Sequence, residues 1–172
     1  AINRAFAPWV YRKLKNNLDA QVVAGQIYIF ALYMVGAILY AALISLGVAN
    51  FIGSNFLKAS SYVYILLPGT VAASIYYVFV NHIFYGGRTE LLTIVTVACA
   101  AAYLVVGWFM VGIWGASGLA FTYMGVSIVQ AGAVFFLAQR MRKLPLAAGW
   151  GEVRANLANL RQWLGYGGDR MQ

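Results

Sequence analysis

The sequence contains few of the side chains on which most protein chemistry depends. Among its 172 residues there are four acidic residues, one histidine and one cysteine. General acid–base catalysis, metal binding and thiol chemistry all draw on these residue types. Their scarcity predicts that the chain has no enzyme active site, no metal site and no cofactor. Cys99 lies in the apolar run Val97–Ala100 and is interpreted as a small packing residue.

Charge of either sign is also scarce. Only 9% of the residues are charged, whereas 63% are apolar. A soluble domain of this length needs charged side chains over most of its surface. The composition therefore predicts an integral membrane protein, with membrane lipid as its main solvent.

Four long stretches carry no charge, and each can hold a membrane-spanning helix, which needs ~20 largely apolar residues. The expected spans are Gln21–Val48, Ser61–Phe84, Leu91–Ile113 and Ser117–Ala138. The connections between them are Ala49–Ser60, Tyr85–Glu90 and Trp114–Ala116. Connections this short make neighbouring helices run antiparallel. We therefore predict an all-α fold in which residues 21–139 form a bundle of four transmembrane helices.

The positions of the basic residues predict the orientation of this bundle. The net charge is +8, and Lys58 is the only one of the twelve Lys and Arg residues on its side of a four-span arrangement. The other eleven are Arg4, Arg12, Lys13, Lys15, Arg88, Arg140, Arg142, Lys143, Arg154, Arg161 and Arg170. Because Lys and Arg collect in cytoplasmic loops, both termini are predicted to face the cytoplasm. The charges are distributed by loop rather than gathered on one face, so nucleic acid is not an expected partner.

The two ends of the chain carry further signals. Residues 1–20 resemble the end of a preceding span followed by a basic cytoplasmic loop, so we expect the chain to be the C-terminal part of a longer protein. Residues 140–172 are expected to be a basic cytoplasmic tail. In this tail, Gly151–Gly165 has apolar residues at three- and four-residue intervals between two tryptophans. This pattern predicts an amphipathic helix on the inner leaflet, or alternatively a helix packed on a missing partner domain.

Two features of the second span invite a functional interpretation. Pro68 removes one backbone hydrogen bond, so a kink or local unwinding is expected there, either as a tolerated distortion or as a hinge. Asn81 and His82 end the same span, where a lone histidine is interpreted as structural. A proton relay needs an intramembrane carboxylate, and no predicted span contains one.

Other polar side chains in the spans are candidates for contact with a substrate. Tyr76 and Tyr77 lie deep, where an aromatic hydroxyl needs a hydrogen-bond partner. Gln130 is the only strongly polar residue deep in the last span, and it is interpreted either as a link between helices or as a cavity-lining group. In that span glycines recur every seven residues, at Gly118, Gly125 and Gly132. They predict a face on which a neighbouring helix packs closely.

Three segments resemble a known family. They are Ala1–Tyr11 (AINRAFAPWVY), which leads into a basic stretch, Asn81–Thr89 (NHIFYGGRT) and Trp114–Phe121 (WGASGLAF). Their order and spacing resemble the C-terminal part of the O-antigen and polysaccharide flippases, the Wzx-type members of the multidrug, oligosaccharidyl-lipid and polysaccharide exporter superfamily. The resemblance extends from Ala1 to about Lys143.

The resemblance implies a function and a larger architecture. The four spans would be the last four of about twelve in a two-bundle transporter, whose missing N-terminal helices become the expected partner. That transporter would translocate undecaprenyl-pyrophosphate-linked oligosaccharide across the bacterial inner membrane for O-antigen, lipopolysaccharide and polysaccharide biosynthesis. Arg88 is then a candidate contact for the pyrophosphate, or otherwise a topological anchor that pairs with Glu90. The alternatives are a non-catalytic membrane subunit and a small self-assembling exporter.

Overall fold

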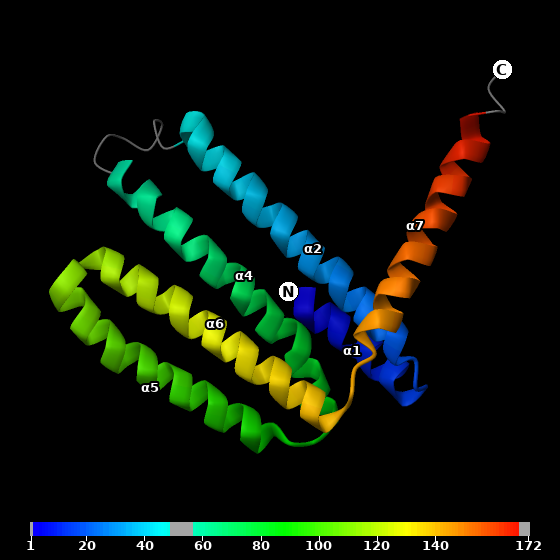
Figure 1. Cartoon of the computed structure of the whole chain (residues 1–172), viewed down its shortest axis with the longest axis horizontal. Coiled ribbons are helices and arrows are strands. Elements are labelled where there is room, and N and C mark those ends of the chain that lie inside the picture. Colours follow the sequence, from blue (N-terminus) through cyan, green and yellow to red (C-terminus); the bar gives the residue numbers. More distant parts are fainter. Residues whose placement is uncertain (1, 49–56, 169–172) are drawn as a thin grey trace. The chain divides into compact units, whose positions relative to one another are not determined.

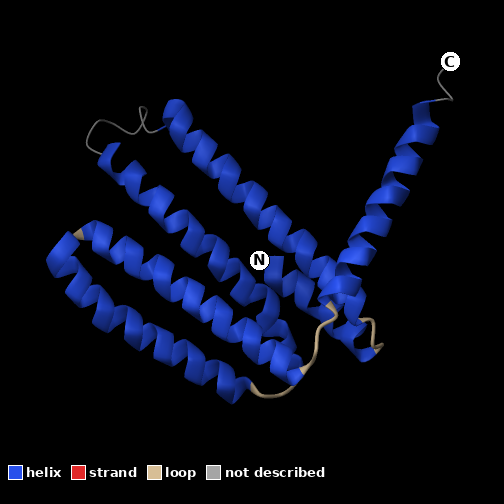
Figure 2. Cartoon of the chain, viewed as in Figure 1, coloured by secondary structure: helices blue, strands red, loops and turns tan. Residues whose placement is uncertain are grey.

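The computed structural model describes residues 2–48 and 57–168, and every regular element in these ranges is a helix (Figures 1 and 2). The elements are α1 (Ile2–Lys15), α2 (Asp19–Leu43), η1 (Ile44–Val48), α4 (Leu57–Tyr85), α5 (Thr89–Trp114), α6 (Ala116–Met141) and α7 (Leu146–Gly168). The predicted all-α fold is confirmed for the described ranges. Residues 49–56 of the predicted connection Ala49–Ser60 fall outside these ranges, and residues 57–60 belong to α4.

Four of the described helices are long and apolar enough to cross a membrane. They cover Asp19–Gly47, Ser61–Tyr85, Thr89–Trp114 and Ala116–Met141. These bounds agree with the predicted spans to within a few residues. Gly47, with a φ of 89°, occupies the left-handed conformation that commonly ends a helix. The prediction of four membrane-spanning helices is confirmed.

The chain forms two compact units. The spanning unit is Phe30–Arg142, and the terminal unit combines Ala1–Ile29 with Lys143–Gln172. The sequence had suggested separate segments at residues 1–20 and 140–172. In the structure these two ends belong to the same unit, together with the first turns of α2.

In the spanning unit, α6 is the central helix. It packs against both α4 and α5, whereas α4 and α5 touch each other at few places (Figure 1). A buried cluster joins all three helices at one end, where α4 and α6 finish and α5 begins. Its members are Val80, Ile83, Leu92, Val134 and Ala138. By contrast, the part of α2 beyond Ile29 exposes much of its apolar surface, with Ile38 62% accessible.

Two glycine turns hold the three packed helices in register. Gly87, with a φ of 70°, lies in the turn between α4 and α5, and Gly115 alone connects α5 to α6 with φ 61° and ψ −140°. Residues with a Cβ rarely adopt either conformation, which is why glycine is found at these points. The predicted short connections Tyr85–Glu90 and Trp114–Ala116 are confirmed.

The local unwinding expected at Pro68 does not occur, because α4 is helical throughout Leu57–Tyr85. Thr70 Oγ1 donates a hydrogen bond to the Leu66 carbonyl, 3.1 Å away, within the turn that contains the proline. The neighbouring Gly69 packs closely against α6: a Cβ there would lie 3.0 Å from Met124 Cα. This region of α4 is a packed helical contact. The kink and the hinge at Pro68 stay predictions.

The predicted glycine face of α6 is correct at one position and wrong at two. A Cβ on Gly118 would collide with the carbonyl of Met110 in α5. A Cβ on Gly125 or Gly132 would meet no atom within 4 Å. The backbones of α5 and α6 meet near the one-residue turn at Gly115, whereas further along the two helices enclose a groove that Gly125 lines. A seven-residue repeat predicts which residues share a helix face, but it does not predict how far away the neighbouring helix lies.

In the terminal unit, α1 and the start of α2 form an antiparallel pair. The ring of Trp9 lies against Gly25, and Lys13 Nζ donates a hydrogen bond to Gln21 Oε1 at 2.8 Å. Arg12, Lys13 and Lys15 belong to the last turn of α1 and not to a loop as predicted. The helix persists through these residues because Val10, Leu14 and Val22 form a buried cluster.

The predicted tail helix is confirmed, and it begins earlier than expected. It covers Leu146–Gly168, five residues before the predicted start at Gly151. Gly149 lies in direct contact with Val23 of α2, where a Cβ would collide with the valine side chain. The apolar pattern in the sequence could not show this extension, because the extra turn is held by a glycine contact.

Candidate functional site

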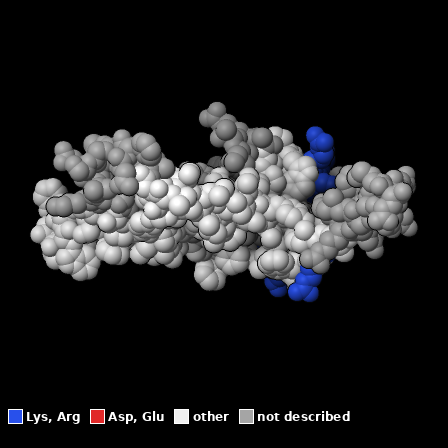
Figure 3. Space-filling view, turned by 90° about the horizontal axis from the view of Figure 1, so that it is seen from above, with Lys and Arg blue, Asp and Glu red and all other residues white. Residues whose placement is uncertain are grey.

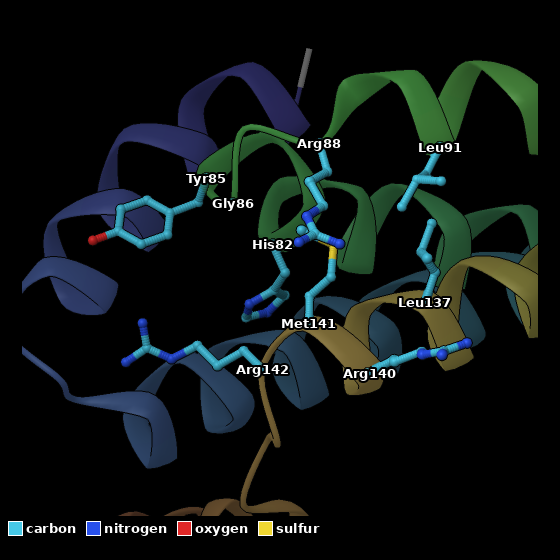
Figure 4. A pocket seen from close by; sticks show the side chains of 9 residues that line it. All are labelled: His82, Tyr85, Gly86, Arg88, Leu91, Leu137, Arg140, Met141 and Arg142. Carbon is cyan, nitrogen blue, oxygen red and sulfur yellow. The ribbon is translucent and has the colours of Figure 1, made fainter.

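A cavity of about 850 Å³ lies at the end of the spanning unit that carries the buried cluster (Figure 4). Its walls come from the ends of all three packed helices and from one interhelical turn. The lining residues are His82, Tyr85, Gly86, Arg88, Leu91, Leu137, Arg140, Met141 and Arg142. We call this cavity the cationic pocket.

The packing of the helix ends positions the lining residues. α4 ends at Tyr85, where Gly86 donates its backbone N–H to the His82 carbonyl at 3.0 Å. α6 ends at Met141, where Arg142 donates to the Ala138 carbonyl at 3.0 Å. Leu137 and Met141 pack against the buried cluster and also line the cavity. Side chains that line the pocket therefore also take part in the packing that holds the three helices together.

The pocket is strongly positive. Three arginines line it, and no Asp or Glu is among the lining residues. Glu90, in the first turn of α5, is exposed and lies outside the lining. On the face drawn in Figure 3, few of the described residues are Lys or Arg, and most of the described surface is uncharged.

The three arginines approach the pocket from different directions. In Figure 4, Arg88 extends from its turn toward Met141 and His82, while Arg142 extends toward the side where Tyr85 lies. Arg140 points the opposite way from Arg142 and forms a flank of the cavity. Arg88 caps no helix with its side chain, so its guanidinium is not engaged in closing the first turn of α5.

His82 forms the buried part of the site. It is 4% exposed, and its ring is tilted against that of Phe79 with the centroids 6.2 Å apart. The arginines around it are more accessible: Arg88 and Arg140 are exposed and Arg142 is half-buried. The pocket thus combines a buried imidazole with guanidinium groups that solvent can reach.

The helix ends add their own partial charges. The carboxyl ends of α4 and α6 present carbonyl groups with partial negative charge, which basic side chains in the last turn complement. His82 and Arg140 occupy those last turns. Arg88 and Arg142 lie just outside α4 and α6. Their positive charge therefore exceeds what the partial negative charge of the two helix ends offsets. An anion that enters the pocket is therefore favoured.

Of the residues predicted to contact a substrate, Arg88 alone lines the pocket. Tyr76 packs against the buried cluster, and its ring meets that of Tyr77 edge to face, with the centroids 5.2 Å apart. Tyr77 is half exposed on the outside of α4. Asn81 is 2% exposed and fully enclosed next to His82, and it does not line the cavity. None of these three residues lines the cationic pocket, because the helical turn directs them to other faces of α4. Their contact with a substrate stays a prediction.

Gln130 is half-buried on α6 and lines neither this pocket nor the groove between α5 and α6. It lies seven residues before Leu137, on nearly the same face but about 10 Å deeper along the helix. The sequence prediction missed His82, Arg140 and Arg142 as members of a site. The signal was present, since antiparallel spans bring the turn at Arg88 and the end of α6 to the same side of the membrane.

A second cavity of about 350 Å³ lies between the middle parts of α5 and α6. Its lining residues are Cys99, Ala102, Val106, Met110, Phe121, Thr122, Gly125, Val126 and Val129. Thr122 Oγ1 donates to the Gly118 carbonyl at 2.8 Å, so its hydroxyl is already engaged within α6. We call this cavity the apolar groove, and it offers no charged group to a ligand.

Among the described residues, no group of three or more His, Cys, Asp or Glu side chains is placed to hold a metal ion. The sequence matches no protein-family model, and neither a curated protein nor a solved structure matches the chain. In its described residues the chain is a helical membrane protein with a cationic pocket between the ends of three packed helices.

Proposed function

We propose that this chain is the C-terminal part of a flippase that moves undecaprenyl-pyrophosphate-linked oligosaccharide across the bacterial inner membrane, for polysaccharide and lipopolysaccharide biosynthesis. The observation that carries the proposal is the cationic pocket, which three arginines line without an acidic residue. The substrate's headgroup joins an anionic pyrophosphate to a bulky sugar. Guanidinium groups suit such a ligand because they bind phosphate oxygens through paired hydrogen bonds.

The position of the pocket along the spans supports this assignment. Its residues lie at the ends of the spans Ser61–Tyr85 and Ala116–Met141, on the side that holds eleven of the twelve basic residues. Under the positive-inside rule that side is cytoplasmic, and both termini are cytoplasmic with it. A lipid-linked precursor made on the inner leaflet would meet the pocket there.

This topology is tested by labelling single cysteines in the Cys99→Ala background. Cysteines at Ala116 and at Lys143 lie at opposite ends of α6 in the proposed topology. An impermeant thiol reagent added to cells with a permeabilised outer membrane should modify the cysteine at position 116 and spare the one at position 143. Equal modification of both would overturn the proposed topology.

The competing explanation of Arg88 is a topological anchor. An anchor needs only positive charge, so Arg88→Lys should then be neutral. A phosphate contact made through two parallel hydrogen bonds needs the planar guanidinium, which lysine does not supply. We expect Arg88→Lys to lower O-antigen display in a flippase-deficient strain that carries the whole transporter, at unchanged protein abundance.

A matched control separates contact from net charge. Lys143 is exposed and lies just beyond the pocket lining. Lys143→Gln removes one positive charge from the same end of the protein, and it should leave O-antigen display unchanged. Wild-type display by both Arg88→Lys and Arg88→Gln strains would contradict the proposed contact.

A non-catalytic membrane subunit is the second candidate. The exposed apolar surface of α2 and α5 favours it, since Ile38 and Trp108 are 62% and 81% accessible. Such surfaces suit either lipid or further helices. A subunit without transport activity of its own would tolerate Arg88→Gln with no change in O-antigen display.

A further inference from the structure

Helix α7 presents an apolar stripe that the described part of the protein leaves uncovered. Leu146, Trp150 and Leu157 are 41%, 55% and 51% exposed. At about 100° per residue these three positions lie within about 40° of one another around the helix. A soluble helix end would direct polar side chains to solvent here. The stripe therefore needs an apolar or interfacial environment.

The contact of α7 with α2 fixes the depth at which this stripe lies. Gly149 lies against Val23, and Val153 is buried as well. Val23 is the fifth residue of the span that begins at Asp19, so the contact lies about 6 Å along that span. The first turns of α7 are consequently held at the membrane boundary rather than far out in the cytoplasm.

The polar side chains of α7 match a membrane surface. Arg154 is exposed and lies about 60° from Leu157, at the edge of the apolar stripe. Glu152, the one acidic residue in the described length of α7, projects about 140° away from Leu157. A tryptophan on the apolar side and an arginine beside it are the arrangement of an interfacial helix.

From these observations we propose that α7 lies in the cytoplasmic interface of the membrane and binds anionic phospholipid. Leu146, Trp150 and Leu157 enter the upper acyl region, and Arg154 contacts the negatively charged headgroups. The Gly149–Val23 contact sets the side of α7 that faces the lipid. This inference does not rest on the transport function; it uses only the assignment of the basic end of the spans to the cytoplasm.

The test is the depth of spin labels in the full chain, purified and placed in nanodiscs of phosphatidylglycerol and phosphatidylcholine. Single cysteines replace Leu157 or Ala155 in the Cys99→Ala background. Ala155 is exposed and about 160° from Leu157 around the helix, which makes it the matched control. We expect the label at position 157 to collide with oxygen and to be shielded from a water-soluble nickel complex. The label at position 155 should show the reverse.

Removal of single charges tests the anionic lipid. Arg154→Gln should lower the ratio of inserted to free α7 by about fivefold in nanodiscs that contain phosphatidylglycerol. Glu152→Gln, on the opposite side, should not lower it. In phosphatidylcholine alone the two variants should behave alike.

Three results would overturn the proposal. Labels at both positions open to the nickel complex would place α7 in water. Labels at both positions shielded from both reagents would mean that protein, such as a second copy of the chain, covers the stripe. Equal insertion in the two lipid compositions would remove the role of anionic lipid.

Discussion

The cationic pocket and the apolar groove both involve α5 and α6, yet they differ in almost every property. The cationic pocket, of about 850 Å³, has three arginines and a histidine in its walls. The apolar groove, of about 350 Å³, has no charged side chain, and its one hydroxyl is bonded within its own helix. α6 contributes to both cavities, with its last turn in one and its middle turns in the other.

The difference shows that the depth of a cavity along a span determines which side chains can line it. In the middle of the bilayer, an unpaired polar group has no water to satisfy it, so hydroxyls bond to carbonyls of their own helix. At the end of the spans, long basic side chains reach the headgroup region and water. The same packed helices thus form a cationic pocket at one end and an apolar groove in the middle.

The largest effect is expected when a charged side chain is introduced into the apolar groove, which tests this difference between the two cavities. Val129→Arg places a guanidinium near the middle of α6, on a side chain that is 65% exposed. We expect it to disfavour membrane insertion by ~2.5–3.5 kcal/mol. Leu91→Arg, in the lining of the cationic pocket and in the first turn of α5, should cost much less because its side chain can reach the membrane surface. Glycosylation mapping measures the inserted fraction of the span that carries each substitution, α6 for Val129→Arg and α5 for Leu91→Arg. Equal insertion of the two spans would contradict the comparison.

Within α6, two glycines should respond differently to the same substitution. Gly118→Leu overpacks the contact with the Met110 carbonyl and should lower stability in detergent by ~1–3 kcal/mol. Gly125→Leu extends into the apolar groove, where a Cβ meets no atom within 4 Å, so its effect should be small. Thermal unfolding in detergent compares the stability of the two variants. A loss at Gly125 as large as that at Gly118 would mean that the groove is a packed interface.

The smallest expected effect is at the rim of the cationic pocket. A Cβ on Gly86 would press on the methyl end of Met141, which is flexible and can move aside. Gly86→Ala should therefore change stability by less than ~0.5 kcal/mol. Gly87→Ala should cost more, about 1 kcal/mol, because Gly87 has a φ of 70°. A reversed order in thermal unfolding would show that Met141 is held rigidly.

The sequence predicted the elements of this fold well and the site only in part. Uncharged stretches longer than 20 residues have one stable form in a bilayer, so the spans from Asp19 to Met141 followed from composition. Arg88 was also found, because a lone arginine in a short interhelical turn is conspicuous. These successes rest on local signals that do not depend on how the helices pack.

The composition of the pocket depends on how the helices pack, which local signals do not show. Tyr76 and Gln130 were selected for their polarity at depth, and their faces and depths place them outside the pocket. Arg140 and Arg142 were counted only for orientation, although the turn of Arg88 meets them in space. A helical period does not reveal which turn of one helix lies beside which turn of another. That relation is set by close contacts such as Gly69 with Met124.

The binding of pyrophosphate to the purified chain in nanodiscs tests the central claim most directly. Calorimetric titration should detect binding to the wild-type chain and to Lys143→Gln with the same affinity. Arg88→Gln removes a charge-assisted hydrogen-bond donor from the pocket, and we expect its affinity to fall by roughly tenfold to a hundredfold. The account is contradicted if pyrophosphate binds Arg88→Gln as tightly as the wild-type chain, or if Lys143→Gln loses as much affinity as Arg88→Gln.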